Sequence, residues 1–221
     1  MRNLLPLFVD LVGREVLLVG GGPVAAAKLR QLVAAGARVR VVAPLVLAEM
    51  AATPDVAIIR RAFAPADLDG VWLVVAAATP EVNREVAAAA EIRRVFVNAV
   101  DDPQNATAYL SGVVRRDEVT IAISTSGDAP ALTALVREAL EALLPRELAA
   151  WVHVARKERA IWKRDRVPME ARKPRLLHAL NALYHSDDDA AETPLDGRVP
   201  APTTAATANV PRLHGPEDSW L

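Results

Sequence analysis

The fold is decided by one stretch, Glu15-Val16-Leu17-Leu18-Val19-Gly20-Gly21-Gly22-Pro23-Val24-Ala25. It predicts a short apolar strand, a glycine turn and the start of a helix. The spacing Gly20-x-Gly22-x-x-Ala25 matches the dinucleotide-binding pattern. Gly20 suits the tight turn, Gly22 lets the backbone approach a pyrophosphate, and Ala25 lets the helix pack closely on the strand. The helix N-terminus then offers free N–H groups to phosphates, with Pro23 in its first turn.

The residues after this turn complete a βαβ unit. Helical periodicity runs from about Val24 to Ala35, Gly36 supplies a C-terminal cap, and Val39–Ala43 reads as the second strand. The unit is about 30 residues long, which is typical of a crossover between parallel strands. That context strengthens the glycine pattern, which by itself also fits a turn that binds nothing.

The end of the second strand lacks the acidic residue that commonly holds the ribose hydroxyls. It reads Val42-Ala43-Pro44-Leu45. Backbone groups or residues from elsewhere would then have to hold the ribose, unless no nucleotide binds. Arg38 and Arg40 could attract a 2′-phosphate, although solvated surface arginines are the commoner explanation.

Three more strands and a helix continue the alternation. The strands are Ala57–Arg60, Trp72–Ala76 and Val95–Val97, and the Ala-rich helix is Pro80–Ile92. This order predicts an α/β fold with a doubly wound, Rossmann-like parallel sheet. The small residues Ala77-Ala78-Thr79, which follow the fourth strand, leave room for a ligand at the carboxyl edge of the sheet.

An acidic segment, Asn98-Ala99-Val100-Asp101-Asp102-Pro103, follows the fifth predicted strand. Ligands of open α/β sheets bind outside the carboxyl ends of the strands, so carboxylates at this point are candidates for a site. A solvated Asp-Pro turn is the alternative interpretation.

The pattern then changes. Thr107–Leu110 looks extended, and Val113–Ile123 reads as two strands around a charged turn. The polar loop Ser124–Pro130 leads into a helix whose apolar stripe runs from Leu132 to Leu143. Such a loop at a helix N-terminus could hold an anion, and ordinary helix capping by its Ser, Thr and Asp residues is an equal alternative.

The last part of the chain divides into a basic region and a polar tail. After the break at Pro145, residues 146–184 are helical in pattern and carry ten Lys/Arg against four Asp/Glu. This face is either simply solvated or suited to a substrate with several carboxylates. From Ser186 onward the sequence is rich in Pro, Ala, Thr and Asp, which predicts a disordered tail.

Composition excludes several classes of function. The net charge of −1 argues against nucleic acid as a general partner. The absence of cysteine excludes disulfides, thiolate metal sites and Cys nucleophiles. No apolar run reaches about 18 residues, which predicts no membrane span, and the N-terminus lacks a signal-peptide layout. We therefore expect a cytoplasmic protein.

Taken together, these motifs resemble the precorrin-2 dehydrogenase / sirohydrochlorin ferrochelatase family, the N-terminal module of siroheme synthases. The resemblance covers about residues 4–145, and the number, order and spacing of the motifs make it specific. The motifs are Leu5-Pro6-Leu7-Phe8, Gly20–Ala25 with Lys28, Ala35-Gly36-Ala37, Val42-Ala43-Pro44, Ala77-Ala78-Thr79 with Asn83, Asn98–Pro103, and Ile123–Gly127 with Pro130.

The resemblance implies a domain order. Residues 1–111 would form an NAD-binding Rossmann domain, and residues 112–145 a small α+β dimerisation domain with swapped β structure. Residues 146–185 would form a helical C-terminal module. Residues 186–221, which composition predicts to be disordered, lie outside the resemblance. The family also implies a homodimer.

The resemblance implies oxidation of precorrin-2 to sirohydrochlorin with NAD as hydride acceptor. In some members it also implies insertion of Fe²⁺ to give siroheme, and nothing in this sequence decides whether the chain does so. The expected partners are the tetrapyrrole substrate and, for a chelatase, Fe²⁺. The macrocycle supplies nitrogen ligands to the iron, so no metal site in the protein is expected.

Site residues carry over from the family position by position. Asp101 aligns with the family's essential acid and is our candidate base for the proton that leaves the substrate. The missing acid after the second strand becomes an expected feature, because this family holds NAD without one. The predicted cofactor contacts are Gly20, Gly21, Gly22, Pro23, Val24, Pro44, Leu45 and Thr79, and the predicted substrate contacts are Asn98, Ser124, Thr125 and Ser126.

Two other functions compete with a precorrin-2 dehydrogenase. A short-chain dehydrogenase needs a Tyr-x-x-x-Lys pair, but Tyr109 is followed four residues later by Val113, and Tyr184 by Asp188. A non-catalytic NAD-sensing module remains an alternative. The acid after the fifth strand and the basic helical region argue against it.

The chain departs from the family pattern at two places. The family's usual Ser-Pro before the last core helix is Ala129-Pro130 here. The helical C-terminal region matches the family only loosely, and the tail beyond Ser186 does not match it.

Overall fold

The computed structural model describes residues 4–127 and 129–185. Within them the chain forms two compact units. The first contains the residues up to Val114 together with Ile121–Ala142. The second contains Arg115–Thr120 together with the residues from Leu143 onward.

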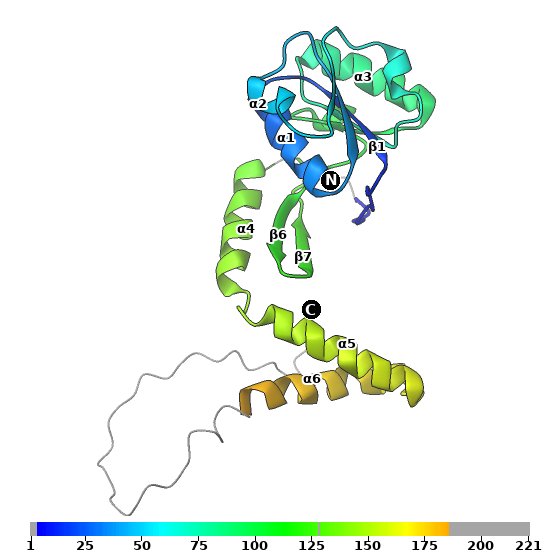
Figure 1. Ribbon diagram of the computed structural model, residues 1–221. Coiled ribbons are helices and arrows are strands. Elements are labelled where there is room, and N and C mark those ends of the chain that lie inside the picture. Colours follow the sequence, from blue (N-terminus) through cyan, green and yellow to red (C-terminus); the bar gives the residue numbers. More distant parts are fainter. Residues whose placement is uncertain (1–3, 128, 186–221) are drawn as a thin grey trace, which may run out of the picture. The chain divides into compact units, whose positions relative to one another are not determined.

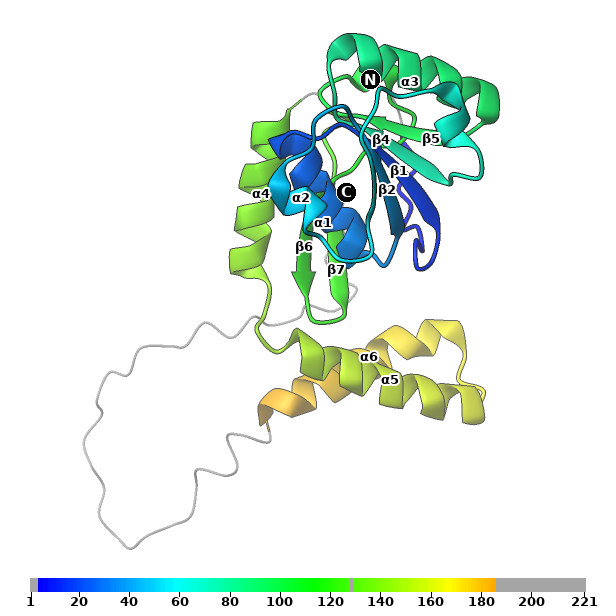
Figure 2. The same ribbon diagram turned by 45° about the horizontal axis from the view of Figure 1, so that its top comes forward.

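The first unit is built on a five-stranded parallel sheet with the order β3-β2-β1-β4-β5 (Figure 2). This confirms the predicted doubly wound fold. The chain turns from one side of the sheet to the other between β1 and β4, and the glycine turn directly follows β1 at that switch point. The strands are β1 (Glu15–Val19), β2 (Arg38–Val42), β3 (Ala57–Ile59), β4 (Leu73–Ala76) and β5 (Phe96–Ala99).

Two helices cover opposite faces of the sheet: α1 (Pro23–Ala34) and α3 (Pro80–Arg93) (Figure 1). Successive residues of β1 alternate between them, because side chains along a strand point to opposite faces. Val16 and Leu18 pack with α1, whereas Leu17 and Val19 pack with α3. On the helices, the buried residues are Ala25, Ala26, Leu29 and Leu32 of α1 and Asn83, Val86, Ala89 and Ala90 of α3.

Two features near β5 correct the sequence analysis. The strand continues to Ala99, so Asn98 lies inside it rather than in the following loop, paired with Val75 of β4. The segment Thr107–Leu110 forms no strand. It bends instead, and the backbone N–H groups of Thr107 and Ala108 both donate to the Val97 carbonyl at 2.9 Å.

Three short elements had no periodic signal in the sequence. They are the helix α2 (Ala48–Ala51) and the 3₁₀ turns η1 (Pro65–Leu68) and η2 (Pro103–Asn105). Each is four residues or fewer, which is too short to show an amphipathic period.

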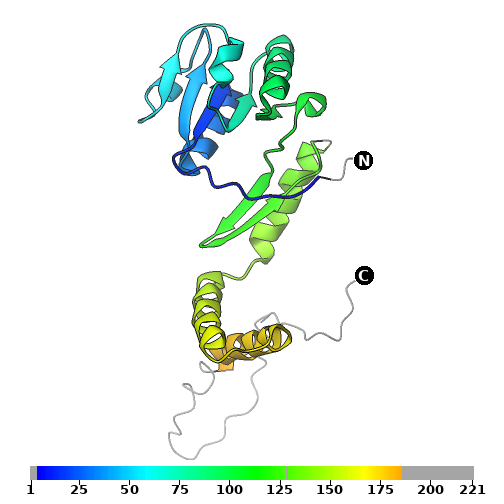
Figure 3. The same cartoon turned by 90° about the vertical axis from the view of Figure 1, so that its right-hand side faces the viewer.

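The rest of the first unit is the base of a hairpin and a long helix, and the hairpin turn, Arg115–Thr120, belongs to the second unit. The strands β6 (Gly112–Arg116) and β7 (Val119–Ile123) form a two-stranded sheet, and α4 (Pro130–Leu143) lies beside it (Figures 1 and 3). The contact is close at Gly112, where a Cβ atom would lie 2.6 Å from Cγ2 of Thr133.

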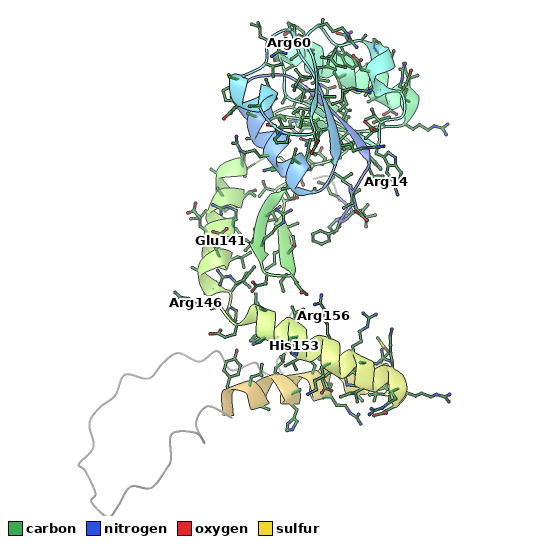
Figure 4. All side chains as sticks on the ribbon, viewed as in Figure 1. Arg14, Arg60, Glu141, Arg146, His153 and Arg156 are labelled. Carbon is green, nitrogen blue, oxygen red and sulfur yellow. The ribbon has the colours of Figure 1, made fainter. Side chains whose placement is uncertain are left out.

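The second unit contains two helices in the region that the sequence predicted to be helical, α5 (Leu148–Arg164) and α6 (Met169–His185), which pack on each other. Trp151 of α5 donates from Nε1 to the Tyr184 hydroxyl of α6 at 2.8 Å. Arg156, labelled on α5 in Figure 4, pairs with Glu118 of the hairpin turn. The predicted tail, residues 186–221, lies outside the described residues. Among the described helices, none has the length and apolar character needed to cross a bilayer.

Candidate functional site

The glycine turn is held between two neighbouring turns of the sheet edge. A Cβ atom on Gly20 would lie 2.2 Å from the Ala77 carbonyl oxygen, after β4, and the φ angle of Gly20 is +129°. A Cβ atom on Gly21 would lie 1.9 Å from the Leu45 carbonyl oxygen, after β2. Neither position has room for a side chain, because three turns meet there.

Gly22 differs from the two residues before it. A Cβ atom there would meet nothing within 4 Å. Gly22 is also the N-cap residue of α1, no side chain caps this helix, and Pro23 follows as its first residue. An uncapped helix N-terminus that faces open space attracts an anion through its free N–H groups and its dipole. The turn therefore fits the pyrophosphate of a dinucleotide.

A hollow of about 390 Å³ lies in front of this turn, and we call it the turn hollow. Four predicted cofactor contacts line it: Gly21, Gly22, Pro44 and Leu45. Four do not. Gly20 lies behind the turn, Pro23 and Val24 are exposed at the start of α1, and Thr79 is the N-cap residue of α3. The complete lining is Gly21, Gly22, Pro44, Leu45, Val46, Leu47 and Arg60.

Arg60 is a lining residue of the turn hollow that the sequence analysis did not single out. It directly follows β3, its side chain is exposed, and Figure 4 labels it in the first unit. Arg38 and Arg40, the arginines considered for a 2′-phosphate, are engaged elsewhere. Arg38 opens β2 and pairs with Glu15 at 2.9 Å, and Arg40 donates to the Asp67 carbonyl at 2.6 Å.

A second pocket, of about 300 Å³, lies where β5 ends, and we call it the Asp101 pocket. Asn98, Asp101, Ser124 and Thr125, all predicted site residues, converge on it, whereas Ser126 does not line it. Segments distant in sequence build its wall. The lining is Lys28, residues 98–103, residues 109–112, residues 123–125, Gly127, Pro130 and Thr133.

Asp101 itself adopts a left-handed backbone conformation, with a φ angle of +56°. Asp tolerates this region better than most residues, and it directs the chain out of the sheet after β5. Its side chain is exposed and has no hydrogen-bond partner in the described part of the chain. The neighbouring Asp102 is occupied, because its carboxylate accepts a bond from Asn105 Nδ2 at 2.7 Å. Asp101 is thus the carboxylate that remains available to a ligand.

Asn98 is buried, with 7% of its surface exposed. Its Nδ2 donates to the Ala108 carbonyl at 3.0 Å, which fixes the orientation of the amide. Its Oδ1 is buried and has no partner within the described residues. A buried acceptor that lacks a partner is costly, so this oxygen is suited to a donor on a ligand.

Lys28 is the second residue that sequence reasoning missed, since it entered only as one letter of a family motif. It lies on α1, is half-buried and lines the Asp101 pocket. Burial lowers the pKa of its ammonium group, and the charge of Asp101 raises that pKa by a smaller amount. The helix that begins at the turn hollow therefore also presents a cation to the Asp101 pocket.

The hydroxyl groups of the loop after β7 hold that loop together. Ser124 Oγ accepts a bond from the backbone N–H of Ser126 at 3.1 Å. Thr125 Oγ1 lies 3.0 Å from Thr133 Oγ1 and accepts a bond from the Ala129 N–H at 3.3 Å. These contacts support the capping interpretation of this loop. No group of three or more His, Cys, Asp or Glu residues within the described ranges is arranged to hold a metal ion.

Comparison with known proteins identifies the family of this chain. Residues 7–112 match the family described as "Putative NAD(P)-binding", and residues 116–143 match "Sirohaem biosynthesis protein central". The chain belongs to the family of siroheme synthase N-terminal modules. This confirms the resemblance drawn from the motifs, and it confirms the prediction of an NAD(P)-binding domain.

Siroheme synthases from three bacteria illustrate the match. Siroheme synthase 3 of Aeromonas hydrophila is 47% identical over 150 residues, which are 66% of this chain and 32% of that protein. The siroheme synthase of Photorhabdus laumondii is 39% identical over 184 residues, 81% of this chain and 39% of that protein. That of Zymomonas mobilis is 37% identical over the same shares. This chain thus spans about a third of the length of the curated relatives it matches.

A solved structure matches the siroheme synthase module over most of its length. SirC, a precorrin-2 dehydrogenase, superposes with a TM-score of 0.60 at 25% identity. The match covers 79% of this chain and 88% of SirC. It confirms the predicted order of a Rossmann-like sheet, a small hairpin-and-helix region and C-terminal helices.

Proposed function

We propose that this chain oxidises precorrin-2 to sirohydrochlorin, with NAD⁺ as the hydride acceptor. The carrying observation is that one unit presents an open, uncapped helix N-terminus at Gly22 and an available carboxylate at Asp101. Both follow strands of the same parallel sheet, so they share its carboxyl edge. The length of the match with SirC supports the same activity.

The residues divide the reaction between them. NAD⁺, when bound, would be the hydride acceptor. The substrate loses one hydride and one proton, which is a two-electron oxidation. Gly22 and the first turn of α1 would hold the pyrophosphate, and Pro44 and Leu45 would contact the adenosine part of the cofactor. Asp101 accepts the proton and passes it to solvent, to which its carboxylate is exposed.

The decisive assay mixes purified protein with precorrin-2 and NAD⁺ under anaerobic conditions at neutral pH. The formation of NADH is followed by its absorbance. We expect turnover that depends on both substrates. Wild-type protein that binds NAD⁺ but forms no NADH would instead favour the non-catalytic NAD-sensing module.

Metal insertion is a second candidate function of the same pocket. Two pyrrole N–H protons must leave the macrocycle when Fe²⁺ enters it, and the free Asp101 carboxylate and the free Asn98 Oδ1 are acceptors in one pocket. Fe²⁺ would be a substrate held by the macrocycle nitrogens. Sirohydrochlorin mixed with Fe²⁺ or Co²⁺ should then change its absorption faster with the protein than without it, and equal rates would rule this activity out.

We propose that the exposed apolar surface of α4 is the interface of a homodimer. This helix has no buried residue among those described, although its apolar stripe is the strongest of the described helices. Leu132, Leu135 and Leu143 are 50%, 63% and 77% exposed. Exposed patches of this kind mark interfaces, and a second copy of the chain is the occupant that the family implies.

The mass in solution tests the dimer. We expect the wild type to have twice the chain mass of 23.7 kDa by light scattering, and Leu135→Glu to shift toward the monomer because it places a charge in the interface. Glu138→Gln, one turn away on the same helix, is the control and should stay dimeric. A wild type that is monomeric at all concentrations would contradict the proposal.

A further inference from the structure

Lys28 stands out among the cations of the first unit because its ammonium group has lost water without gaining an ion-pair partner. The residue is half-buried, and burial lowers the pKa of its side chain. No carboxylate oxygen of the described residues lies within the 4.0 Å that defines an ion pair. A partly dehydrated charge without a partner is unfavourable, so such a group is best explained by a ligand that supplies the counter-charge.

The direction of Lys28 follows from the packing of α1. The residue lies one turn from Ala25 and one turn from Leu32, which are both buried against the sheet. Val100 and Leu110 pack against the same cluster of buried residues, so the chain leaving β5 reaches the α1 face. This packing places Lys28 at the wall of the Asp101 pocket, where it is the one Lys, Arg or His among the described lining residues.

A second group of the same pocket is also incomplete. Asn98 is 7% exposed, its Nδ2 is engaged with the Ala108 carbonyl, and its Oδ1 is buried without a partner in the described chain. The pocket thus contains an unpaired cation and an unpaired acceptor. A ligand that satisfies both must carry an anionic group and an N–H or O–H donor.

We infer that Lys28 binds a peripheral carboxylate of the tetrapyrrole and thereby orients the macrocycle against Asp101, while Asn98 Oδ1 accepts a hydrogen bond from a ring N–H. This assignment rests on the proposed dehydrogenase function and deepens it. It makes Lys28 a specificity-determining residue for the substrate, outside the basic C-terminal helices considered in the sequence analysis. It also explains how a pocket with two aspartates tolerates a polyanionic substrate, since Lys28 offsets their repulsion.

Lys28 lies on the same helix, α1, that begins at the glycine turn. The same helix offers its N-terminus at Gly22 to the dinucleotide and Lys28, less than two turns later, to the macrocycle. One rigid element therefore aligns the two reactants. A substitution that displaces α1 should weaken the binding of both the dinucleotide and the tetrapyrrole. Removal of the Lys28 charge should weaken only the binding of the tetrapyrrole.

The test compares Lys28→Met and Lys28→Arg with the wild type. Methionine keeps much of the length of the side chain and removes the charge, and arginine keeps the charge. Arg30→Met is the matched control, because Arg30 lies two residues further along α1, is exposed, and is absent from the lining of both pockets. Four quantities are measured: the affinity for sirohydrochlorin by absorbance titration, the affinity for NAD⁺ by calorimetry, the steady-state constants for precorrin-2, and the melting temperature.

For Lys28→Met we expect about 10- to 100-fold weaker binding of sirohydrochlorin and a KM for precorrin-2 raised by a similar factor, the loss typical of one charged hydrogen bond. The affinity for NAD⁺ should stay within about twofold. Lys28→Arg should recover most of the binding, and Arg30→Met should match the wild type. The melting temperature of Lys28→Met should be equal or higher, because a dehydrated, unpaired charge has been removed.

Three outcomes overturn the inference. The first is a Lys28→Met variant that binds sirohydrochlorin as tightly as the wild type. The second is a variant that loses NAD⁺ affinity alone, which would assign Lys28 to the cofactor. The third is a lowered melting temperature with Lys28→Arg binding no better than Lys28→Met, which would make the role structural. If the wild type forms no NADH but binds sirohydrochlorin through Lys28, the proposed dehydrogenase fails while the ligand assignment stands.

Discussion

The turn hollow and the Asp101 pocket lie at the same edge of one sheet, yet they are built in different ways. The turn hollow is lined by two glycines and by the apolar loop after β2, with Arg60 as its one charged residue among those described. The Asp101 pocket is made of side chains that come from α1, β5, the loop after β7 and α4. The turn hollow is formed mainly by two turns of the βαβ unit, whereas the Asp101 pocket exists only where five segments meet, residues 109–112 among them.

The two regions should therefore respond differently to substitutions. The glycine turn depends on the absence of side chains, so almost any side chain added there damages it. A side-chain site depends on the chemistry of particular groups, so isosteric substitutions can remove function while the fold survives.

The largest effect is expected from Gly21→Ala compared with Gly22→Ala. The added Cβ on residue 21 would lie 1.9 Å from the Leu45 carbonyl oxygen, a backbone atom that cannot move alone. We expect the free energy of unfolding to fall by about 3 kcal/mol or more, as in severe overpacking. Chemical denaturation measures it.

Gly22→Ala should leave the fold intact, because its backbone is extended (φ −88°, ψ −173°) and a Cβ meets nothing within 4 Å. It should weaken NAD⁺ binding by about tenfold or more, since the methyl group occupies the space that a pyrophosphate approaches. Equal stability losses in the two variants would contradict the division of roles between Gly21 and Gly22.

In the Asp101 pocket, Asp101→Asn should lower kcat by about 10²- to 10⁴-fold, the usual contribution of a positioned base. The affinity for NAD⁺ and the melting temperature should hardly change, because Asn tolerates the left-handed backbone as Asp does. Asp117→Asn is the matched control, since Asp117 is also left-handed (φ +52°) but lies in the hairpin turn. Wild-type turnover in Asp101→Asn would remove Asp101 from the chemistry and leave the cofactor assignment standing.

A smaller effect is expected where the turn hollow does use a side chain. Arg60→Ala should weaken binding of NADP⁺ by about three- to tenfold, because an exposed arginine in the hollow is available to a 2′-phosphate. Binding of NAD⁺ should change less. Arg38→Ala serves as the control, because Arg38 begins β2, away from the hollow, and pairs with Glu15. Calorimetric titration with both dinucleotides decides, and equal losses for the two would place Arg60 at the shared part of the cofactor.

The smallest effect at neutral pH concerns a carboxylate that belongs to neither site. Hydrogen bonds from the Arg61 guanidinium hold the pKa of Asp67 below its ordinary value, although burial acts in the opposite direction. A depressed pKa contributes stability above the unfolded-state value of about 4, and that stability is lost as the pH falls through the lower folded-state value. We expect the free energy of unfolding to decrease below about pH 4 in the wild type, and less steeply in Asp67→Asn. Identical acid profiles would show that Asp67 is not the responsible group.

Residue by residue, the sequence analysis succeeded where a local rule applied. The G-x-G-x-x-A spacing located the turn, because only small residues allow three turns to meet there, and the position of Asp101 after β5 followed from the order of parallel strands. The segment Thr107–Leu110, which looked extended in the sequence, bends instead, and the backbone N–H groups of Thr107 and Ala108 both donate to the Val97 carbonyl. Thr79, a predicted cofactor contact, is the N-cap residue of α3 and does not line the turn hollow, so its contact with the cofactor stays a prediction.

Two kinds of information were therefore needed. The sequence by itself determined the βαβ unit, the parallel order of the sheet and the presence of an acid at its carboxyl edge, because these depend on periodicity and on turn chemistry between near neighbours. Only the tertiary structure decided that Lys28 and Asp101 line the same pocket, that Asn98 Oδ1 has no partner among the described residues, and that Arg60 rather than Arg38 lines the hollow. Those facts depend on how α1 packs on the sheet and on where the strand ends converge, and neither leaves a periodic trace in the chain.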